Sequence, residues 1–157
     1  MSGIVKKKIV LAGNSGVGKT TLAKRLTGRY TEDTRMTVGV EFFTVREGNV
    51  KLVVFDFAGQ ERFRPVIEGM GRGASMVLLV FDVSRPSTLY SLREWATVSG
   101  ASDARILLVG NKIDLGMRVD LEEIRRVAAE LGADGVILVS ANTGEGIEEL
   151  KKTLVSA

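Results

Sequence analysis

The sequence contains no cysteine and no histidine. Without cysteine the chain can form no disulfide, thiolate metal site or cysteine nucleophile, and it offers no residue for prenylation or palmitoylation. Position 2 is Ser2, which excludes N-myristoylation, so we expect no direct lipid anchor. Without histidine there is no imidazole base or metal ligand. Any metal must therefore be held by oxygen donors, which favours Mg²⁺.

Long apolar runs and an excess of one charge are also missing. The longest apolar run covers residues 76–81, far too short to cross a membrane, and the start of the chain has no secretory pattern. Net charge is only +3, and the one basic run, residues 6–8, lacks the interleaved aromatics of a nucleic-acid platform. We therefore expect a cytoplasmic protein with no nucleic-acid partner, reaching membranes only through a partner. Its 157 residues are expected to form a single domain, 1–157.

Apolar runs alternate with helical patterns along the chain, which indicates an α/β fold. Strands are expected at about 4–12, 40–47, 50–57, 76–82, 105–110 and 136–139, and helices at about 19–28, 62–72, 86–98, 120–132 and 147–155. Gly48 and Asn49 predict a hairpin turn, which would make strand 40–47 an antiparallel edge strand. The polar stretch 28–37 has no apolar period and is expected to be a loop.

Residues 13–20, Gly-Asn-Ser-Gly-Val-Gly-Lys-Thr, fit the phosphate-binding pattern G-x-x-x-x-G-K-[ST] between a predicted strand and a predicted helix. Glycines let successive backbone N–H groups wrap around phosphate oxygens, and the helix adds its positive N-terminal end. Lys19 would reach the β- and γ-phosphates, and the Thr20 hydroxyl would bind Mg²⁺. The expected nucleotide-binding residues here are Asn14, Ser15, Gly16, Val17, Gly18, Lys19, Thr20 and Thr21.

A second group of polar residues follows the predicted strand 50–57. Asp56 stands at the carboxyl end of that strand, where a carboxylate can hold Mg²⁺ through water. Gly59 leaves its N–H open to a terminal phosphate. Gln60, the only glutamine of the chain, would orient a water for in-line attack.

Two further segments predict recognition of the base. Asn111, Lys112 and Asp114 come directly after strand 105–110. An aspartate carboxylate can accept two hydrogen bonds side by side from guanine, whereas adenine would leave it unpaired, and Lys112 can lay its methylenes along the base. After the last strand stand Ser140, Ala141 and Asn142, where the Ala141 N–H could meet the guanine carbonyl oxygen.

Taken in this order, the four segments resemble the motifs of the Ras-like small GTPases, most closely the Rab and Ras branches, over nearly the whole chain. The resemblance implies a three-layer P-loop NTPase fold whose six-stranded mixed sheet has the order 2-3-1-4-5-6 with strand 2 antiparallel. It also implies that Thr37 completes the Mg²⁺ coordination and that Tyr30 stacks on the guanine. Residues of about 30–40 and 59–72 would form switch I and switch II.

These residues predict a GTP-binding protein that hydrolyses GTP, with Lys19 and Mg²⁺ neutralising charge and Gln60 holding the water. We expect slow turnover, a monomer, and an activating protein, an exchange factor and effectors that bind the switches. Two alternatives remain open: an interaction module that holds GTP or GDP and barely hydrolyses, and a P-loop ATPase or kinase, against which Asn111–Asp114 argues. A separate hypothesis makes Arg35 an internal arginine finger.

Overall fold

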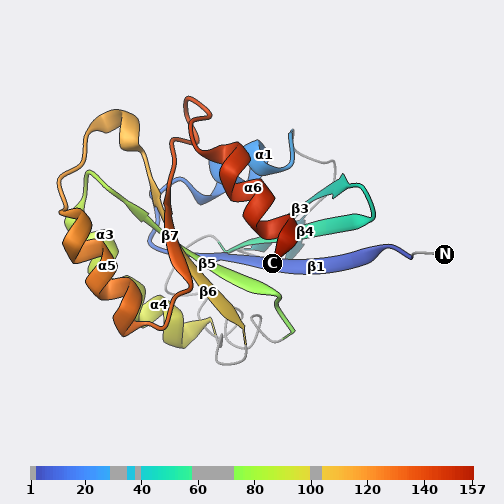
Figure 1. Ribbon diagram of the computed structural model, residues 1–157, viewed down its shortest axis with the longest axis horizontal. Helices are drawn as coiled ribbons and strands as arrows, with labels where there is room; N and C mark the ends of the chain where they lie inside the picture. The colour runs from blue at the N-terminus through green and yellow to red at the C-terminus, as the bar shows by residue number, and fades with distance from the viewer. Residues whose placement is uncertain (1–2, 29–34, 38–39, 58–72, 100–103) are drawn as a thin grey trace.

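The computed structural model of the chain describes residues 3–28, 35–37, 40–57, 73–99 and 104–157 (Figure 1). Its strands are β1 (Val5–Ala12), β2 (Arg35–Thr37), β3 (Val40–Glu47), β4 (Val50–Phe57), β5 (Met76–Asp82), β6 (Arg105–Asn111) and β7 (Gly135–Leu138). Its helices are α1 (Lys19–Leu26), α3 (Pro86–Tyr90), α4 (Leu92–Val98), α5 (Leu121–Glu130) and α6 (Ile147–Ser156), with a 3₁₀ turn, η2, at Ile113–Leu115. Among the described residues, no helix is both long enough and apolar enough to cross a membrane.

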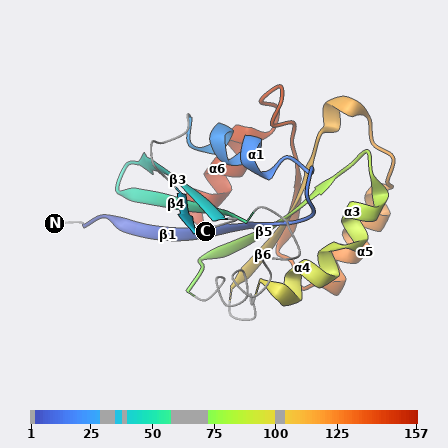
Figure 2. The same cartoon turned by 180° about the vertical axis from the view of Figure 1, so that it is seen from behind.

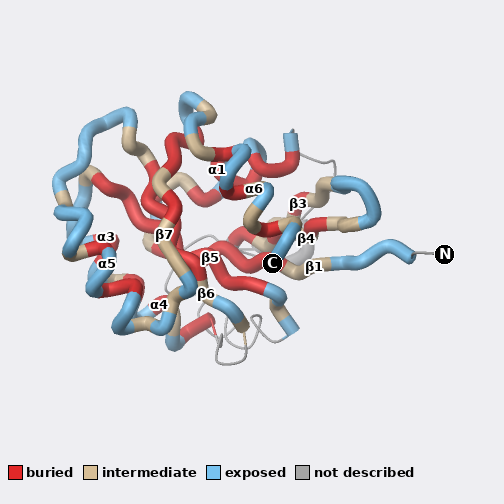
Figure 3. Tube along the Cα trace, in the orientation of Figure 1, coloured by how far each residue is buried: buried red, intermediate tan, exposed pale blue. Residues whose placement is uncertain are grey.

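The strands form one mixed sheet in the order β2-β3-β4-β1-β5-β6-β7. Strands β4, β1, β5, β6 and β7 run parallel to one another, and β3 runs antiparallel to β4. The expected six-stranded order is therefore confirmed by β3, β4, β1, β5, β6 and β7, with β3 as the antiparallel strand. The strand β5 lies between β1 and β6 and is buried along its whole length, as the continuous apolar run 76–81 requires (Figure 3).

Helices cover both faces of the sheet, which gives the expected three layers. Figures 1 and 2 show α1 and α6 side by side on one face and α3, α4 and α5 on the other. Alternate residues of β1 separate the two cores: Ile9 and Leu11 pack with α1 and α6, whereas Val10 and Ala12 pack toward α3, α4 and α5. The three layers form because each helix buries its apolar stripe against one of the two apolar faces of the sheet.

Two expectations about the elements are wrong. Residues 35–37 lie within the expected loop but form strand β2, which pairs with β3, so β2 and not β3 is the edge strand. The pairing of a three-residue strand is made by backbone groups and leaves no side-chain period in the sequence. The expected helix 86–98 is interrupted by a turn at Ser91, which keeps helical dihedral angles and bonds back to the Ser87 carbonyl through its own hydroxyl.

All five parallel strands end at the same edge of the sheet. The residues that follow β1, β6 and β7 therefore come together there with Asp56 near the end of β4, although they are separated by up to 129 positions (Gly13 to Asn142) in the chain. This is the edge at which α/β sheets bind their ligands. The positions of the candidate residues are thus set by strand order rather than by neighbourhood in the sequence.

Gly146 gives a test of how closely α6 packs against the end of β7. It precedes α6 with φ +81°, and a Cβ at this position would lie 2.5 Å from the Leu138 carbonyl oxygen. We expect Gly146→Ala to lower the free energy of unfolding in urea by about 2–4 kcal/mol, because left-handed strain and a backbone clash add.

The matched control is Gly48→Ala in the β3–β4 turn. Gly48 also has positive φ, +62°, but a Cβ there meets no atom within 4 Å among the described residues. This variant should lose only about 1 kcal/mol. Equal losses in the two variants would show that the contact with Leu138 has no effect on stability.

Candidate functional site

The loop between β1 and α1 approaches the end of β6 so closely that a side chain is excluded. Gly18 precedes α1 with φ +98°, and a Cβ on it would lie 2.4 Å from Nδ2 of Asn111. That amide nitrogen donates to the Val17 carbonyl oxygen at 2.9 Å. The last glycine of the phosphate-binding pattern therefore has two roles: it adopts a left-handed backbone conformation, and it leaves room for the Asn111 side chain.

Lys19 is folded back over this loop. It is 5% exposed, and its Nζ donates to the carbonyl oxygens of Gly13 at 3.0 Å and Asn14 at 3.2 Å. Burial lowers the pKa of Lys19, and the neighbouring Asp56 carboxylate opposes that shift. The ammonium is thus fixed and partly desolvated, which strengthens its attraction for an anion in the loop.

Thr20 and Asp56 form a pair of oxygen donors at the start of α1 and the end of β4. The Thr20 hydroxyl donates to Oδ2 of Asp56 at 2.6 Å, while Oδ1 is buried without a hydrogen-bond partner among the described residues. Burial raises the pKa of Asp56, against the hydrogen bond from Thr20 and the charge of Lys19. A buried carboxylate oxygen without a partner is costly unless a ligand completes it.

These two side chains fit a magnesium ion. Mg²⁺ binds oxygen donors, often through one or two carboxylates with waters and substrate phosphates completing the octahedron. Thr20 and Asp56 offer a hydroxyl and a carboxylate, and Ser15, Gly16, Lys19 and Thr20 line the same hollow. The donor set is thus the kind that a metal–phosphate complex needs.

Asn111 also contacts the loop after β7. Its Oδ1 accepts a hydrogen bond from the Ala141 N–H at 2.9 Å, and the side chain is buried. The N–H that the sequence assigned to the base carbonyl is therefore directed at Asn111 in this structure. The amide joins three segments, since its other end holds Val17.

Lys112 also lies against the phosphate loop, at Gly16. It is the only non-glycine residue with positive φ in the described part of the chain, φ 71°, a conformation that costs about 1–3 kcal/mol. Its Nζ donates to the Gly16 carbonyl oxygen at 2.8 Å and lies 3.7 Å from the buried carboxylate of Asp82. Sequence reasoning missed Asp82, although an acid at the end of an all-apolar strand was a signal that could have been used.

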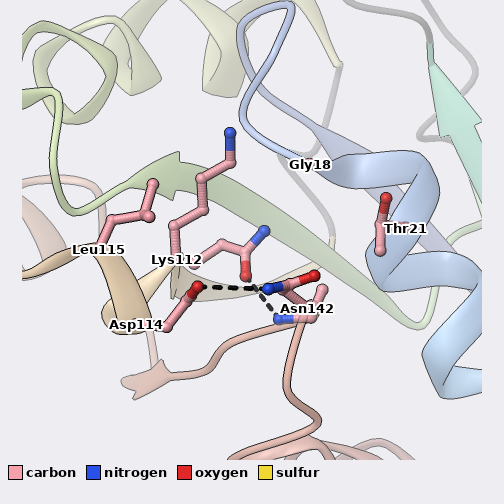
Figure 4. Close-up of a pocket in the computed structure, with 8 residues that line it drawn as sticks. Gly18, Thr21, Lys112, Asp114, Leu115 and Asn142 are labelled. Carbon is pink, nitrogen blue, oxygen red and sulfur yellow. Dashed lines mark hydrogen bonds between the residues drawn. The ribbon is translucent and has the colours of Figure 1, made fainter.

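Asp114 is held from the loop after β7. Figure 4 shows Asp114 and Asn142 turned toward each other from different segments. Oδ1 of Asp114 accepts a hydrogen bond from the Ser140 hydroxyl at 2.7 Å, and Oδ2 accepts one from Asn142 Nδ2 at 3.5 Å. The Ser140 hydrogen bond lowers the pKa of this exposed carboxyl most strongly. Asp114 is therefore anionic at neutral pH.

Two neighbouring hollows lie among these residues. One of about 250 Å³ is lined by residues of the phosphate loop and Asp56, and one of about 310 Å³ lies beside Asp114. They share Gly18 and Thr21 in their walls. The lining of the larger hollow is Gly18, Thr21, Asn111, Lys112, Asp114, Leu115, Ala141 and Asn142 (Figure 4). A hollow that contains the Lys19 ammonium and the Asp56 carboxylate thus adjoins one that contains the Asp114 carboxylate.

Sequence reasoning did not foresee that α4 takes part. The indole N–H of Trp95 donates to Oδ1 of Asn14 at 2.7 Å, and Asn14 Nδ2 donates to the Ser91 hydroxyl at 3.2 Å. Trp95 is buried on the face of the sheet opposite α1. No motif marks this contact, because it depends on how α4 crosses the sheet.

Some predicted site residues are not described. Tyr30, Gly59 and Gln60 lie outside the described residues. Thr37 and Arg35 belong to β2, of which the backbone pairing alone is described. The remaining predicted residues of the phosphate loop, of 111–114 and of 140–142, together with Asp56, lie at the one edge of the sheet.

Comparison with known proteins agrees with this geometry. A model of the Ras family matches residues 8–157. The human Ras-related protein Rab-19 is 38% identical over 154 residues, which cover 91% of this chain and 70% of that protein. A putative Ras-related protein Rab-5B of Dictyostelium discoideum is 36% identical (91% of this chain, 71% of that protein), and the Ras-related protein RABA2a of Arabidopsis thaliana is 36% identical (95% and 73%).

The Asp56 carboxylate should cost stability when no metal is present. Burial raises its pKa above the ordinary 3.8, so the charged form at pH 7 destabilises the folded state. In the absence of nucleotide and Mg²⁺, we expect the free energy of unfolding of Asp56→Asn at pH 7 to equal or exceed that of wild type. The difference should shrink as the pH falls through the raised pKa, because wild-type Asp56 then becomes neutral.

When Mg²⁺ and a nucleotide are added, wild type should become the more stable of the two proteins in urea unfolding, since only wild type keeps the carboxylate ligand. Asp134→Asn, which alters an exposed carboxylate paired with Arg105, is the control and should show neither effect. A variant at Asp56 that is less stable than wild type at pH 7 without metal would contradict the assignment.

Proposed function

Because the chain belongs to the Ras family and is a small GTPase, we propose that it binds GTP and GDP in the two joined hollows and hydrolyses GTP to GDP and phosphate. The observation that carries the proposal is the shared wall of Gly18 and Thr21 between a hollow with the Lys19 ammonium and one beside Asp114. A nucleoside polyphosphate likewise has two adjoining parts, an anionic phosphate chain and a base. The whole chain, residues 1–157, would form the single domain that does this.

Recognition of guanine would depend on Asp114. The ring N1–H and the exocyclic amine of guanine are parallel donors that match a carboxylate, and this carboxylate is ionised and held by Ser140 and Asn142. Adenine presents a ring acceptor there and would leave the charge unpaired. Lys112 would lie along one face of the base, and Tyr30 would stack on it. The Ala141 N–H would share its proton between Asn111 and the base carbonyl.

The phosphates would lie in the loop of residues 13–20. Backbone N–H groups of Asn14 to Thr21 would surround them, and Lys19 would neutralise their charge. Mg²⁺, held by Thr20, by Thr37 and through water by Asp56, would supply charge neutralisation between the β- and γ-phosphates. The buried Oδ1 of Asp56 supports this role, because it has no hydrogen-bond partner among the described residues.

Hydrolysis would need positioning and charge stabilisation rather than a covalent intermediate. Gln60 would orient the attacking water in line with the γ-phosphate, and Lys19 would neutralise the charge that develops on the departing oxygen. Without an arginine from a partner, we expect turnover on the order of 10⁻⁴ to 10⁻² s⁻¹. An activating protein would accelerate it.

The output would be a change of conformation. Contacts of the γ-phosphate with Thr37 and Gly59 would order switch I, about 30–40, and switch II, about 59–72, and loss of that phosphate would release them. An exchange factor would reload the monomeric protein, and effectors would bind the ordered switches. The protein would work in the cytoplasm and would reach membranes through protein partners.

Asp114→Ala tests recognition of the base. Wild type should prefer GDP to ADP by about 10⁴ or more, and the variant should lose about a hundredfold in GDP affinity with little change for ADP. Equilibrium competition against radiolabelled GDP measures both nucleotides. Asp134→Ala removes an exposed carboxylate from the opposite end of β7 and should leave the preference unchanged. If ADP displaces GDP as well as GTP does in wild type, the proposed nucleotide is wrong.

Gln60→Leu tests hydrolysis separately from binding. The variant keeps the size of the side chain but has no amide to hold the water, so single-turnover phosphate release should fall about tenfold or more. Its affinity for GTP should stay within about twofold of wild type. Wild-type turnover in the variant would remove Gln60 from the mechanism.

A further inference from the structure

Arg25 bridges the phosphate-binding helix and the loop after β7. It lies near the end of α1, and its guanidinium donates from Nε to the Ala141 carbonyl oxygen at 2.7 Å and from Nη2 to the Asn142 carbonyl oxygen at 2.8 Å. Two donors of one planar group thus bind consecutive carbonyl groups more than a hundred residues away in the chain. Such a fork fixes orientation as well as distance.

The loop that Arg25 holds is closed on itself. The Ser140 N–H donates to the Glu145 carbonyl at 2.9 Å, and the Gly144 N–H donates to the Ser140 carbonyl at 2.7 Å. A Cβ on Gly144 would lie 3.4 Å from Nη1 of Arg25, an ordinary contact distance, so the guanidinium also lies close to this turn of the loop. Because the loop is compact, fastening it at two carbonyls restrains it as one unit.

The same loop holds the carboxylate that would choose the base. The hydrogen bonds to Asp114 come from the side chains of Ser140 and Asn142, at 2.7 and 3.5 Å. Asn142 also provides one of the two carbonyl groups that Arg25 binds, and Ser140 directly precedes Ala141, which provides the other. A displacement of the loop would therefore change how Asp114 is oriented.

We propose that Arg25 is a positioning residue for guanine recognition: it fixes the loop of residues 140–145, and with it Asp114, at a set distance from the phosphate-binding start of α1. The inference rests on the proposed function. Arg25 does not line either hollow and acts through the loop. Loss of its two hydrogen bonds leaves the phosphate contacts in place but lets the base contacts drift. Guanine nucleotides are then released faster, and the exocyclic amine of the base is read less strictly.

Arg25→Met, made in the full chain, keeps most of the side-chain volume and removes every donor. We expect radiolabelled GDP to dissociate about tenfold faster with Mg²⁺ present, because two hydrogen bonds from a charged donor are lost at an exposed site. The preference for GDP over inosine diphosphate, which lacks only the exocyclic amine, should fall about threefold. Arg25→Lys, which reaches one carbonyl, should give intermediate values.

The matched control is Arg46→Met. Arg46 also donates through Nε to a backbone carbonyl, that of Gly48 at 3.0 Å, but in the β3–β4 turn. This variant should keep the wild-type dissociation rate and the wild-type preference. A loss of stability alone would leave the ratio of GDP to inosine diphosphate affinity unchanged, so this ratio separates positioning from a merely structural role.

The outcomes distinguish the two proposals. Binding of GDP by wild type and Arg46→Met, with an Arg25→Met variant that releases GDP faster and discriminates less, supports the inference. Binding by all three proteins with equal rates, or faster release with an unchanged ratio, overturns it and leaves the proposed function standing. Failure of wild type and Arg46→Met to bind GDP overturns both.

Discussion

The side-chain amide of Asn111 connects the phosphate loop to the loop that follows β7. One end donates to Val17 in the phosphate loop, the other accepts from Ala141 after β7, and the absent side chain of Gly18 makes the approach possible. A buried amide with both ends satisfied specifies one arrangement, because any shift leaves a polar group unpaired in the interior. The relative placement of the two hollows therefore depends on this residue, together with the contacts that Arg25 and Lys112 make.

The charged residues around that amide are placed for ligand binding at the expense of stability. Lys19 and Asp56 are both buried, and burial lowers the pKa of Lys19 and raises the pKa of Asp56, which in each case favours the neutral form. Lys112 adds a left-handed backbone conformation that a non-glycine residue seldom adopts. Desolvated, fixed charges interact strongly with a highly charged ligand, since little reorganisation is needed when it arrives. Binding would thus relieve costs that the folded protein already bears.

Much of this arrangement could be predicted from the sequence, because the motifs follow apolar strands. Asp56 and Asn111–Asp114 were assigned to one sheet edge since they stand where buried parallel strands end, and they line two hollows that share a wall at that edge. Contacts made by helix faces could not be predicted. Arg25 occupies an ordinary exposed position of α1, and Asp82 ends an apolar strand without a motif. Strand β2 could not be predicted either, because its pairing uses backbone groups, which leave no pattern in the side chains.

The hydrogen bond between Trp95 and Asn14 has an optical consequence. The chain contains one tryptophan, and its indole N–H contacts the phosphate loop from a helix on the far face of the sheet. Emission from a buried indole depends on the hydrogen bond and polarity at its nitrogen. Small movements of the phosphate loop are therefore reported by the fluorescence of a single native chromophore. The unmodified protein carries its own probe of whether that loop is occupied.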